Sequence, residues 1–486
     1  VWLKRSGRTR PFASWPALQR PIAEAGEQPL AASSVSNEEA PRQSPVMIRA
    51  WALLALLCAA WGVAPGGGLL LRASSGRGGG AAAEASVYRQ TLRNFKNMQY
   101  VGDLVVGGQQ LAGIFDTGSF ELITRSTRCA DCAHPTPPYD KALSHTFAEN
   151  GTTRVHVFGS GPCTSVLGYE TVELGPFRSE RQAFWEIVDH EIPVLDAASF
   201  AAIVGIGPNF GYENTERTLL MNYGIQEFSV CLQKPSGSEG YITWGPTPGF
   251  EADFATAQVI GKHHWGTHLT DVTFAQGDSG HLAQAPCGNG QGCAVLIDSG
   301  TSLIAAPGAA LLQLSQQIQQ VEEDCSNVAS LPPLRFKIDG TSFELPPEAY
   351  VMRMTGAVLE AEDIWDILFF KPKLRKVDIC MPAFTQIEMT SQFGPVWILG
   401  MPFFRYFHTT FDRRNKAMRF SIAGPNCEPQ PFRAASFATF GNETRALPRA
   451  PLLDAALPAA LPPRALLAAR FSAQGESSGG NATVEL

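Results

Sequence analysis

One short motif occurs twice in this chain, and the repeat constrains the fold more than any other feature. Residues 114–119 read Ile-Phe-Asp-Thr-Gly-Ser, and residues 296–302 read Leu-Ile-Asp-Ser-Gly-Thr-Ser. Each apolar pair predicts a strand that delivers an aspartate to a turn, where glycine lets the backbone pass close to the carboxylate. A single Asp-hydroxyl-Gly turn is common. Two copies in the same apolar context indicate a duplication.

A second repeat supports the first. An apolar-apolar-Gly segment follows each aspartate unit, as Ile203-Val204-Gly205 in the first half and Ile398-Leu399-Gly400 in the second. The same order of two motifs, occurring twice, predicts a duplicated domain whose halves face each other about a pseudo-dyad.

The body of the chain has the pattern of a mostly-β protein. Short apolar runs alternate there with Gly, Pro, Asn and Asp, which is typical of strands joined by turns. The clearest runs are residues 100–106, 153–158, 169–174, 228–232, 241–244 and 294–297. One helix is expected over residues 308–323, from apolar residues at helical spacing. We therefore predict two β lobes, over residues 88–247 and 248–424.

The two ends of the chain differ from this body. Residues 1–46, rich in Pro, Ser, Ala and Arg, are interpreted as a leader foreign to the natural protein. Residues 47–66 combine a short basic start, an apolar run and a small-residue exit, which predicts a signal peptide, with a buried helix as the alternative. Residues 67–87 are expected to be a linker or short pro-region, and 425–486 a Pro/Ala-rich disordered tail. No membrane span is expected in the mature chain.

Charge and composition exclude several kinds of function. The net charge of −7 argues against a nucleic-acid partner, which requires a cationic surface. No phosphate-binding glycine loop and no paired zinc-type cysteine motifs are present in the sequence. His190 and the pair His263-His264 are more typical of surface histidines than of metal ligands. We expect no metal and no cofactor.

The cysteines indicate the secretory route. Of ten cysteines, Cys58 lies in the predicted signal peptide, and an odd number remains. Such usage suits an oxidising compartment and leaves one thiol unpaired. Sequons at Asn150, Asn442 and Asn481 agree with a glycoprotein. The expected location is extracellular or a lysosome-like or vacuole-like compartment.

These motifs together resemble the pepsin-like family of aspartic proteases, cathepsin D-like enzymes included. The resemblance covers residues 88–422, nearly the whole predicted body. Further segments that carry it are residues 97–119, Phe228-Ser-Val-Cys-Leu, Gly240-Tyr-Ile-Thr-Trp-Gly, and Trp397-Ile-Leu-Gly with Phe403, Phe404, Arg405, Phe407 and Phe411-Asp-Arg. The resemblance implies a bilobal acid protease fold with two pseudo-symmetric β lobes and an active-site cleft between them.

The resemblance also implies an aspartic endopeptidase whose substrates are proteins and peptides, with Asp116 and Asp298 as the catalytic pair. Two carboxylates held close together keep one proton over a range of acid pH. The ionised member then activates a water, and the other donates to the peptide carbonyl oxygen. Residues expected to support the pair, through turns and hydrogen bonds within and between lobes, are Thr117, Gly118, Ser119, Ser299, Gly300 and Thr301.

The family's disulfides have counterparts here. The resemblance implies the pairs Cys129–Cys132, Cys287–Cys293 and Cys325–Cys380. Cys231 and Cys427 are candidates for a fourth pair in the sheet joining the lobes. Cys163 would then be the unpaired thiol, for which an inert, partly buried role is favoured over a redox role.

Two departures from the family pattern concern the flap, a hairpin that closes over the cleft. The family has a Tyr before Gly-[Ser/Thr]-Gly, whereas this chain has Phe158-Gly159-Ser160-Gly161. The usual Trp partner of that Tyr falls at Ile123. Because the Tyr and its Trp partner are both absent, neither is left buried without a hydrogen-bond partner, and the two changes are consistent with each other. The change is expected to slow catalysis or alter flap closure. Met401 stands where the family usually has an Asp.

Three functions compete on this basis. An active acid endopeptidase, expected to be monomeric, is favoured because both aspartate units are intact. A catalytically weak or inactive binding or inhibitor protein with the same fold is the alternative, since such relatives often lose one of these residues. A β-rich adhesion protein would leave the doubled motif unexplained.

Overall fold

The computed structural model describes residues 69–70, 87–210, 216–247, 253–276, 280–287, 292–360, 373–432, 453–456 and 482–483. The chain divides into two units, Val1–Gly66 and Gly67–Leu486. The first unit, with the predicted leader and signal peptide, lies outside the described residues, as do the sequons at Asn442 and Asn481. None of the helices in the described ranges has the length and apolar character needed to cross a membrane.

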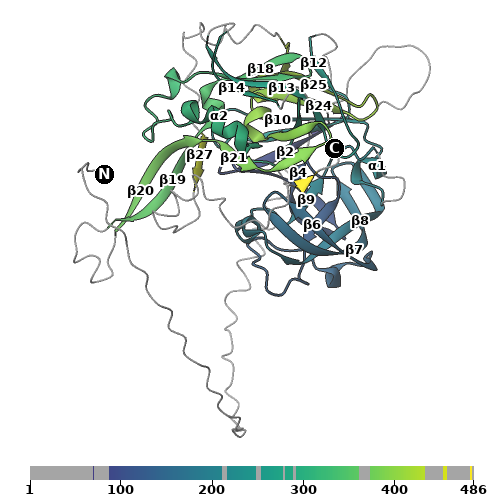
Figure 1. Ribbon diagram of the computed structural model, residues 1–486. Helices are drawn as coiled ribbons and strands as arrows, with labels where there is room; N and C mark the ends of the chain where they lie inside the picture. The colour runs from purple at the N-terminus through teal and green to yellow at the C-terminus, as the bar shows by residue number, and fades with distance from the viewer. Residues whose placement is uncertain are drawn as a thin grey trace, which may run out of the picture. The chain divides into compact units, whose positions relative to one another are not determined.

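The first half of the second unit is built almost entirely of strands. They are β2 (Tyr88–Phe95), β3 (Gln99–Val106), β4 (Gln109–Asp116), β5 (Leu122–Arg125), β6 (Ala148–Phe158), β7 (Gly161–Leu174), β8 (Phe177–His190), β9 (Ala202–Gly205), β10 (Glu227–Leu232) and β11 (Gly240–Trp244), with the one-turn helix α1 (Leu219–Asn222). The long antiparallel strands β6, β7 and β8 group together in Figure 1.

The second half repeats this character. Its strands are β12 (Ala255–Gln258), β13 (Gly266–Gln276), β14 (Gly280–Pro286), β15 (Cys293–Ile297), β16 (Ile304–Pro307), β17 (Leu334–Ile338), β18 (Thr341–Leu345), β19 (Val351–Glu360), β20 (Lys373–Pro382), β21 (Phe384–Ile387), β22 (Met389–Ser391), β23 (Gly394–Leu399), β24 (Phe407–Asp412) and β25 (Ala417–Ala423). Its helices are α2 (Gly308–Ile318), α3 (Pro347–Tyr350) and α5 (Met401–Phe404). The predicted fold class, mostly β in two lobes, is confirmed.

The same three-strand unit occurs in both lobes and explains the two sequence repeats. In the first lobe β4 pairs in parallel with β9, and β9 pairs antiparallel with β5. In the second lobe β15 pairs in parallel with β23, and β23 pairs antiparallel with β16. Asp116 lies opposite Gly205 in this register. The amide of Asp298 donates to Leu399 O at 3.0 Å, beside Gly400.

Close backbone contact accounts for the glycine that ends each apolar-apolar-Gly segment. A Cβ at Gly205 would lie 2.4 Å from the amide nitrogen of Glu121, and a Cβ at Gly400 would lie 2.1 Å from Thr301 O. Because these neighbours are backbone atoms, they have little freedom to move away. Glycine is therefore required where each loop that follows an aspartate passes its neighbouring strand.

One sheet joins the two halves. Its strand order β12-β25-β24-β10-β11-β2 places strands from the second half next to strands from the first. The pairing of β10 with both β11 and β24 is the junction. The disulfide Cys231–Cys427 links β10 to the segment after β25. The lobes are thus connected by backbone hydrogen bonds and by a covalent bond.

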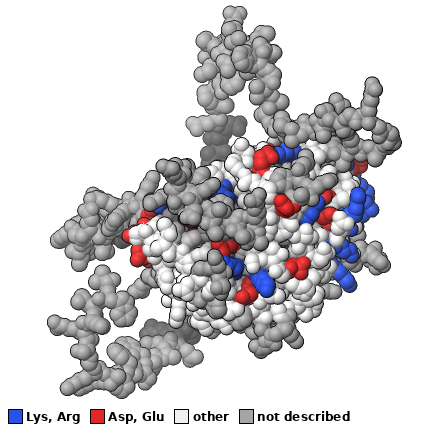
Figure 2. Space-filling view, turned by 90° about the horizontal axis from the view of Figure 1, so that it is seen from above, with Lys and Arg blue, Asp and Glu red and all other residues white. Residues whose placement is uncertain are grey.

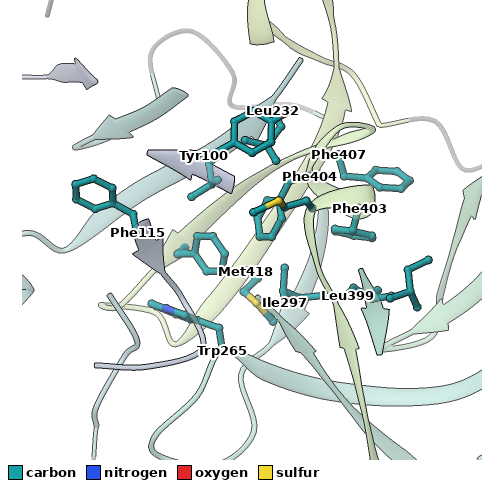
Figure 3. Packing of buried hydrophobic residues seen from close by; sticks show 14 of the residues in the cluster. Tyr100, Phe115, Leu232, Trp265, Ile297, Leu399, Phe403, Phe404, Phe407 and Met418 are labelled. Atoms are coloured by element: carbon teal, nitrogen blue, oxygen red, sulfur yellow. The ribbon is translucent and has the colours of Figure 1, made fainter. Parts of the chain in front are cut away.

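The main hydrophobic core lies behind the two aspartate strands (Figure 3). Phe115 and Ile297, the residues that precede the two aspartates, are both buried in it. Trp265 and Phe411 pack together there, with ring centroids 5.0 Å apart. Burying an apolar side chain of this size stabilises the fold by roughly 1.5–3 kcal/mol. The aspartates therefore extend from well-anchored strands.

Four disulfides are present: Cys129–Cys132, Cys231–Cys427, Cys287–Cys293 and Cys325–Cys380. They include the pair Cys231–Cys427, which the sequence left open. Within the described part of the chain, Cys163 is the free cysteine, and it is buried.

One sequence expectation differs from the structure. Helix α2 ends at Ile318 rather than at residue 323, because acidic residues follow, which disfavour a helix C-terminus, and the chain then turns into the Cys325–Cys380 disulfide. Residues 67–87, expected to be a linker or short pro-region, include β1 (Leu69–Leu70), which pairs with β2. Residues 425–486, expected to be a tail, include β26 (Pro429–Gln430), β27 (Leu453–Ala456) and β28 (Ala482–Thr483).

Candidate active site

Asp116 and Asp298 come together at the meeting point of the two lobes. A Cβ added to Gly118 would lie 2.8 Å from the Asp298 carboxyl carbon, and a Cβ added to Gly300 would lie 2.3 Å from Asp116 Oδ1. Each loop thus passes over the carboxylate of the other lobe. The two carboxyl groups therefore lie close together. Both aspartates are 8% exposed.

Each carboxylate is also held by its own loop, in the same way in both lobes. In the first lobe the Gly118 amide donates to Asp116 Oδ1 at 2.8 Å, and Ser119 Oγ donates to Oδ2 at 2.5 Å. In the second lobe the Gly300 amide donates to Asp298 Oδ1 at 2.8 Å, and its neighbour Thr301 donates to Oδ2 at 2.5 Å. The hydroxyl residues at the ends of the two motifs occupy the expected positions.

The remaining hydroxyl residues cross between the lobes. The Ser299 amide donates to Thr117 Oγ1 at 2.9 Å, and the Thr117 amide donates to Ser299 Oγ at 3.2 Å. Thr117 Oγ1 donates in turn to Ile297 O at 2.8 Å, and Ser299 Oγ donates to Phe115 O. Because Thr117 is fully buried, these bonds are shielded from water. They lock the two loops to each other.

The electrostatics favour retention of a proton in this site. Burial raises the pKa of Asp116 well above its ordinary value, and the charge of Asp298 and the hydrogen bond with it raise it further. The hydrogen bonds from Ser119 and the Gly118 amide oppose this effect but do not cancel it. Two adjacent buried carboxyl groups cannot both ionise without a large electrostatic cost.

Backbone hydrogen bonds from neighbouring segments also hold the two aspartate loops. The Ile206 amide donates to Asp116 O at 2.8 Å, and the Gly207 amide to Ser119 O at 2.6 Å. In the second lobe the Met401 amide donates to Thr301 O at 2.8 Å. The Met401 side chain is buried in the main core. An apolar residue there suits its surroundings, in place of the aspartate that the family usually has.

The flap residues form the turn of the hairpin made by β6 and β7. Phe158 ends β6 and lies opposite Gly161, the first residue of β7, with Gly159 and Ser160 between them. Gly161 has φ +138, a conformation that favours glycine. Phe158 packs against a hydrophobic cluster that contains Ile123 and Trp185. Phe158 and Ile123 thus belong to one apolar cluster.

Sequence reasoning missed a group of polar residues beside this hairpin. Glu121 accepts hydrogen bonds from Arg154, His156 and Trp185. The signal lay in the alternation along the end of β6, where Val155 and Val157 are 59% and 78% exposed, whereas His156 and Phe158 are partly buried. Glu121 itself gave no signal, because its partners are distant in sequence.

The histidines are accounted for by protein contacts. His264, which the sequence suggested to be a surface histidine, is partly buried and donates from Nδ1 to Gly118 O at 2.9 Å. Burial lowers its pKa, against the opposing effect of that hydrogen bond. His190 Nε2 is 3.8 Å from Asp196. Among the described residues, no three His, Cys, Asp or Glu side chains come together in a way that could hold a metal ion.

Comparison with known proteins agrees with this geometry. The family model for the eukaryotic aspartyl protease matches residues 99–423. Cathepsin D of Gallus gallus is 28% identical over 356 residues, covering 68% of this chain and 82% of the relative. Pepsin A of Bos taurus is 26% identical over 354 residues, covering 68% and 86%, and renin of Rattus norvegicus is 27% identical over 358 residues, covering 68% and 81%. With the matched region spanning both aspartate loops, the chain belongs to the eukaryotic aspartyl protease family.

Proposed function

We propose that this protein is an aspartic endopeptidase that hydrolyses peptide bonds of proteins and peptides at acid pH, with Asp116 and Asp298 as a pair that shares one proton. The observation that carries the proposal is the mirrored network around the two carboxyl groups. Each is held by its own loop, and both loops are locked together through Thr117 and Ser299. This arrangement supplies one proton donor and one proton acceptor at a single point.

The reaction follows from the state of the pair. The ionised carboxylate removes a proton from a water held between the two groups, and that water attacks the peptide carbonyl carbon. The protonated carboxyl donates to the carbonyl oxygen, which gives a tetrahedral diol. Proton transfer to the amide nitrogen then releases the amine and regenerates the acid. The raised pKa of Asp116 supports a shared proton at acid pH, and the pair titrates as a unit.

We place this activity in the secretory pathway, outside the cell or in a lysosome-like compartment, with the protein acting as a monomer. The four disulfides support an oxidising route of synthesis. Figure 2 shows Lys and Arg alongside Asp and Glu on the described part of the face in view. Such mixed charge suits a protein that meets varied peptide substrates.

The test is cleavage of a denatured protein substrate from pH 3 to 7, with and without pepstatin. Asp116→Asn and Asp298→Asn are compared with Asp131→Asn, which replaces an exposed aspartate away from the pair. Acid-side cleavage that pepstatin blocks, lost in the first two variants and kept in the third, is expected. A folded wild type that neither cleaves substrate nor binds pepstatin would contradict the proposal and favour a binding protein.

A further inference from the structure

The carboxylate of Glu121 collects three hydrogen-bond donors from two strands of the first lobe. Arg154 Nη1 lies 2.7 Å and Trp185 Nε1 3.1 Å from Oε1, and His156 Nε2 lies 2.9 Å from Oε2. Arg154 and His156 belong to β6, the outer strand of the flap hairpin, and Trp185 belongs to β8. A single side chain thus ties the flap hairpin to the body of the lobe.

His156 also contacts residues of β7 and β8. Its Nδ1 lies 2.8 Å from the Oγ of Ser165 on β7, and its ring packs edge-on against Trp185 with centroids 4.9 Å apart. The guanidinium of Arg154 lies over the same Trp185 ring, 4.5 Å from its centroid. His156 is two residues from Phe158, so the contact is made close to the turn of the hairpin.

Glu121 is connected just as directly to the active-site loop. It lies five residues after Asp116, and its carbonyl oxygen accepts the Gly205 amide at 2.9 Å. Gly205 in turn lies opposite Asp116 in the β4–β9 register. A Cβ at Gly205 would meet the Glu121 backbone, so the two segments are in close contact. Movement of Glu121 away from β9 would disturb the brace of the Asp116 loop.

The geometry points to Glu121 and His156 as positioning residues that hold the flap hairpin against the segment following Asp116. This inference rests on the proposed function, because it concerns how the same site receives its substrate. It assigns the attachment of the hairpin to a carboxylate–imidazole contact, since Phe158 and Ile123 have no polar group to offer.

Several groups surround His156. They are Glu121, Arg154 on its own strand, and on β7 Ser165 and Cys163, which lies opposite it in the register. Burial raises the pKa of the Cys163 thiol to about 11, so that thiol stays neutral. Glu121 is therefore the group that accepts the hydrogen bond from His156 Nε2.

The contacts around Glu121 favour its ionised form. Burial raises the pKa of Glu121, but the hydrogen bond from His156 and the charges of His156 and Arg154 outweigh that effect and hold the pKa below its ordinary value. His156 uses Nε2 for the contact with Glu121, while its Nδ1 lies against Ser165 Oγ on β7. Both ring nitrogens of His156 are thus engaged between the hairpin and Glu121.

The experiment measures hydrogen–deuterium exchange of the full chain without substrate, expressed as protection of residues 153–161 after correction for the pH dependence of chemical exchange. The variants are His156→Gln, His156→Leu and Glu121→Gln, and the control is His145→Gln, at an exposed histidine of the same lobe. Steady-state KM and kcat on a peptide substrate are measured in parallel from pH 4.5 to 7.5.

We expect His156→Leu to lower the protection of the turn about tenfold, the size of a charge-assisted hydrogen bond at a partly exposed site, and to raise KM more than it lowers kcat. His156→Gln keeps a donor, so it should retain most of the protection and the low KM that His156→Leu loses. Glu121→Gln removes the charge but keeps an acceptor, so its loss of protection should be smaller than that of His156→Leu. His145→Gln should behave as wild type.

Wild-type protection and KM in the His156→Leu variant would overturn the inference, as would a loss of protection in His156→Gln as large as that in His156→Leu. Loss of protection throughout the chain in His156→Leu would show unfolding, and the milder Gln variants would then decide. A wild type that cleaves nothing, yet shows the expected protection changes, would overturn the proposed function and leave the attachment of the hairpin standing.

Discussion

The two aspartate loops are nearly identical, whereas the segments that follow them are not. Asp116 and Asp298 have the same partners in the same order, from a glycine amide and a hydroxyl residue. Five residues after each aspartate the lobes diverge, with Glu121 in the first and Leu303 in the second. Leu303 packs against a small apolar cluster, whereas Glu121 binds the flap hairpin.

This difference separates two requirements of one site. The carboxyl pair needs matched loops, because either loop out of place would disturb the shared proton. The flap hairpin exists only beside the first aspartate loop in the described residues, so only that lobe carries a charged residue to hold it. The two lobes thus keep the same residues in the aspartate loops and differ at Glu121 and Leu303, where only the first lobe contacts the flap hairpin.

The largest effect is expected from replacing a glycine by alanine in either of the two aspartate loops. Gly300→Ala would place a Cβ 2.3 Å from Asp116 Oδ1, and Gly118→Ala would place one 2.8 Å from the Asp298 carboxylate. A displacement of this kind should lower kcat by about 100-fold, because reacting groups tolerate little misplacement. Peptide cleavage at pH 4 measures it, with Leu143→Ala, at a side chain that is 67% exposed, as a control for substitution itself. Near-normal activity in both variants would show that the loops need not approach so closely.

A smaller and symmetric effect is expected from the hydroxyl groups that cross between the lobes. Thr117→Val leaves the Ser299 amide and Ile297 O without their partner, and Ser299→Ala does the same to the Thr117 amide and Phe115 O. Each should lower the free energy of unfolding by about 2 kcal/mol, the cost of unsatisfied buried groups. Urea unfolding near pH 5 measures both variants. Effects that differ by more than a factor of about two would break the equivalence of the loops.

Opposite pH responses are expected from two carboxyl groups on one loop. The pKa of Asp116 is raised, so its stabilisation is complete below the ordinary carboxyl range and is lost as pH rises through the raised value. The pKa of Glu121 is lowered, so its stabilisation is complete above the ordinary value and is lost as pH falls through the lowered one.

Urea unfolding of wild type, Asp116→Asn and Glu121→Gln between pH 3 and 7 measures these responses. Asp116→Asn should lose less stability than wild type as pH rises. Glu121→Gln should be less stable than wild type near pH 6 and approach it toward pH 3. Parallel pH profiles for all three proteins would contradict both assignments.

The smallest effect is expected from replacing Glu121, the residue at which the first lobe differs from the second. Glu121→Leu, which copies the second lobe, should raise KM several-fold and leave kcat within about twofold, since the hairpin loses an attachment but the carboxyl pair is untouched. Leu303→Met is the matched control in the other lobe and should leave both constants unchanged. Steady-state kinetics at pH 5 test this. Equal effects of the two changes would mean that Glu121 acts through general packing.

Many strands and both aspartate turns could be predicted from the local sequence. The elements that were predicted incorrectly or not at all depend on distant partners. The repeated motifs predicted the paired strands and the position of both aspartates, because an apolar run leading to a polar turn is a local signal. Helix α2 was predicted five residues too long, since its end depends on a disulfide partner at Cys380. β26 was missed because its partner β25 supplies the hydrogen bonds.

The sequence by itself determined a mostly-β duplicated chain with two aspartates in equivalent motifs. Only the tertiary structure decided which polar groups meet. His156 lies 35 residues after Glu121 in the sequence, and Trp185 lies 64 residues after it. Strand formation depends on neighbours along the chain, which a sequence displays directly. The contacts of a buried carboxylate depend on sheet register and lobe packing, which bring distant residues within hydrogen-bonding distance only after the chain has folded.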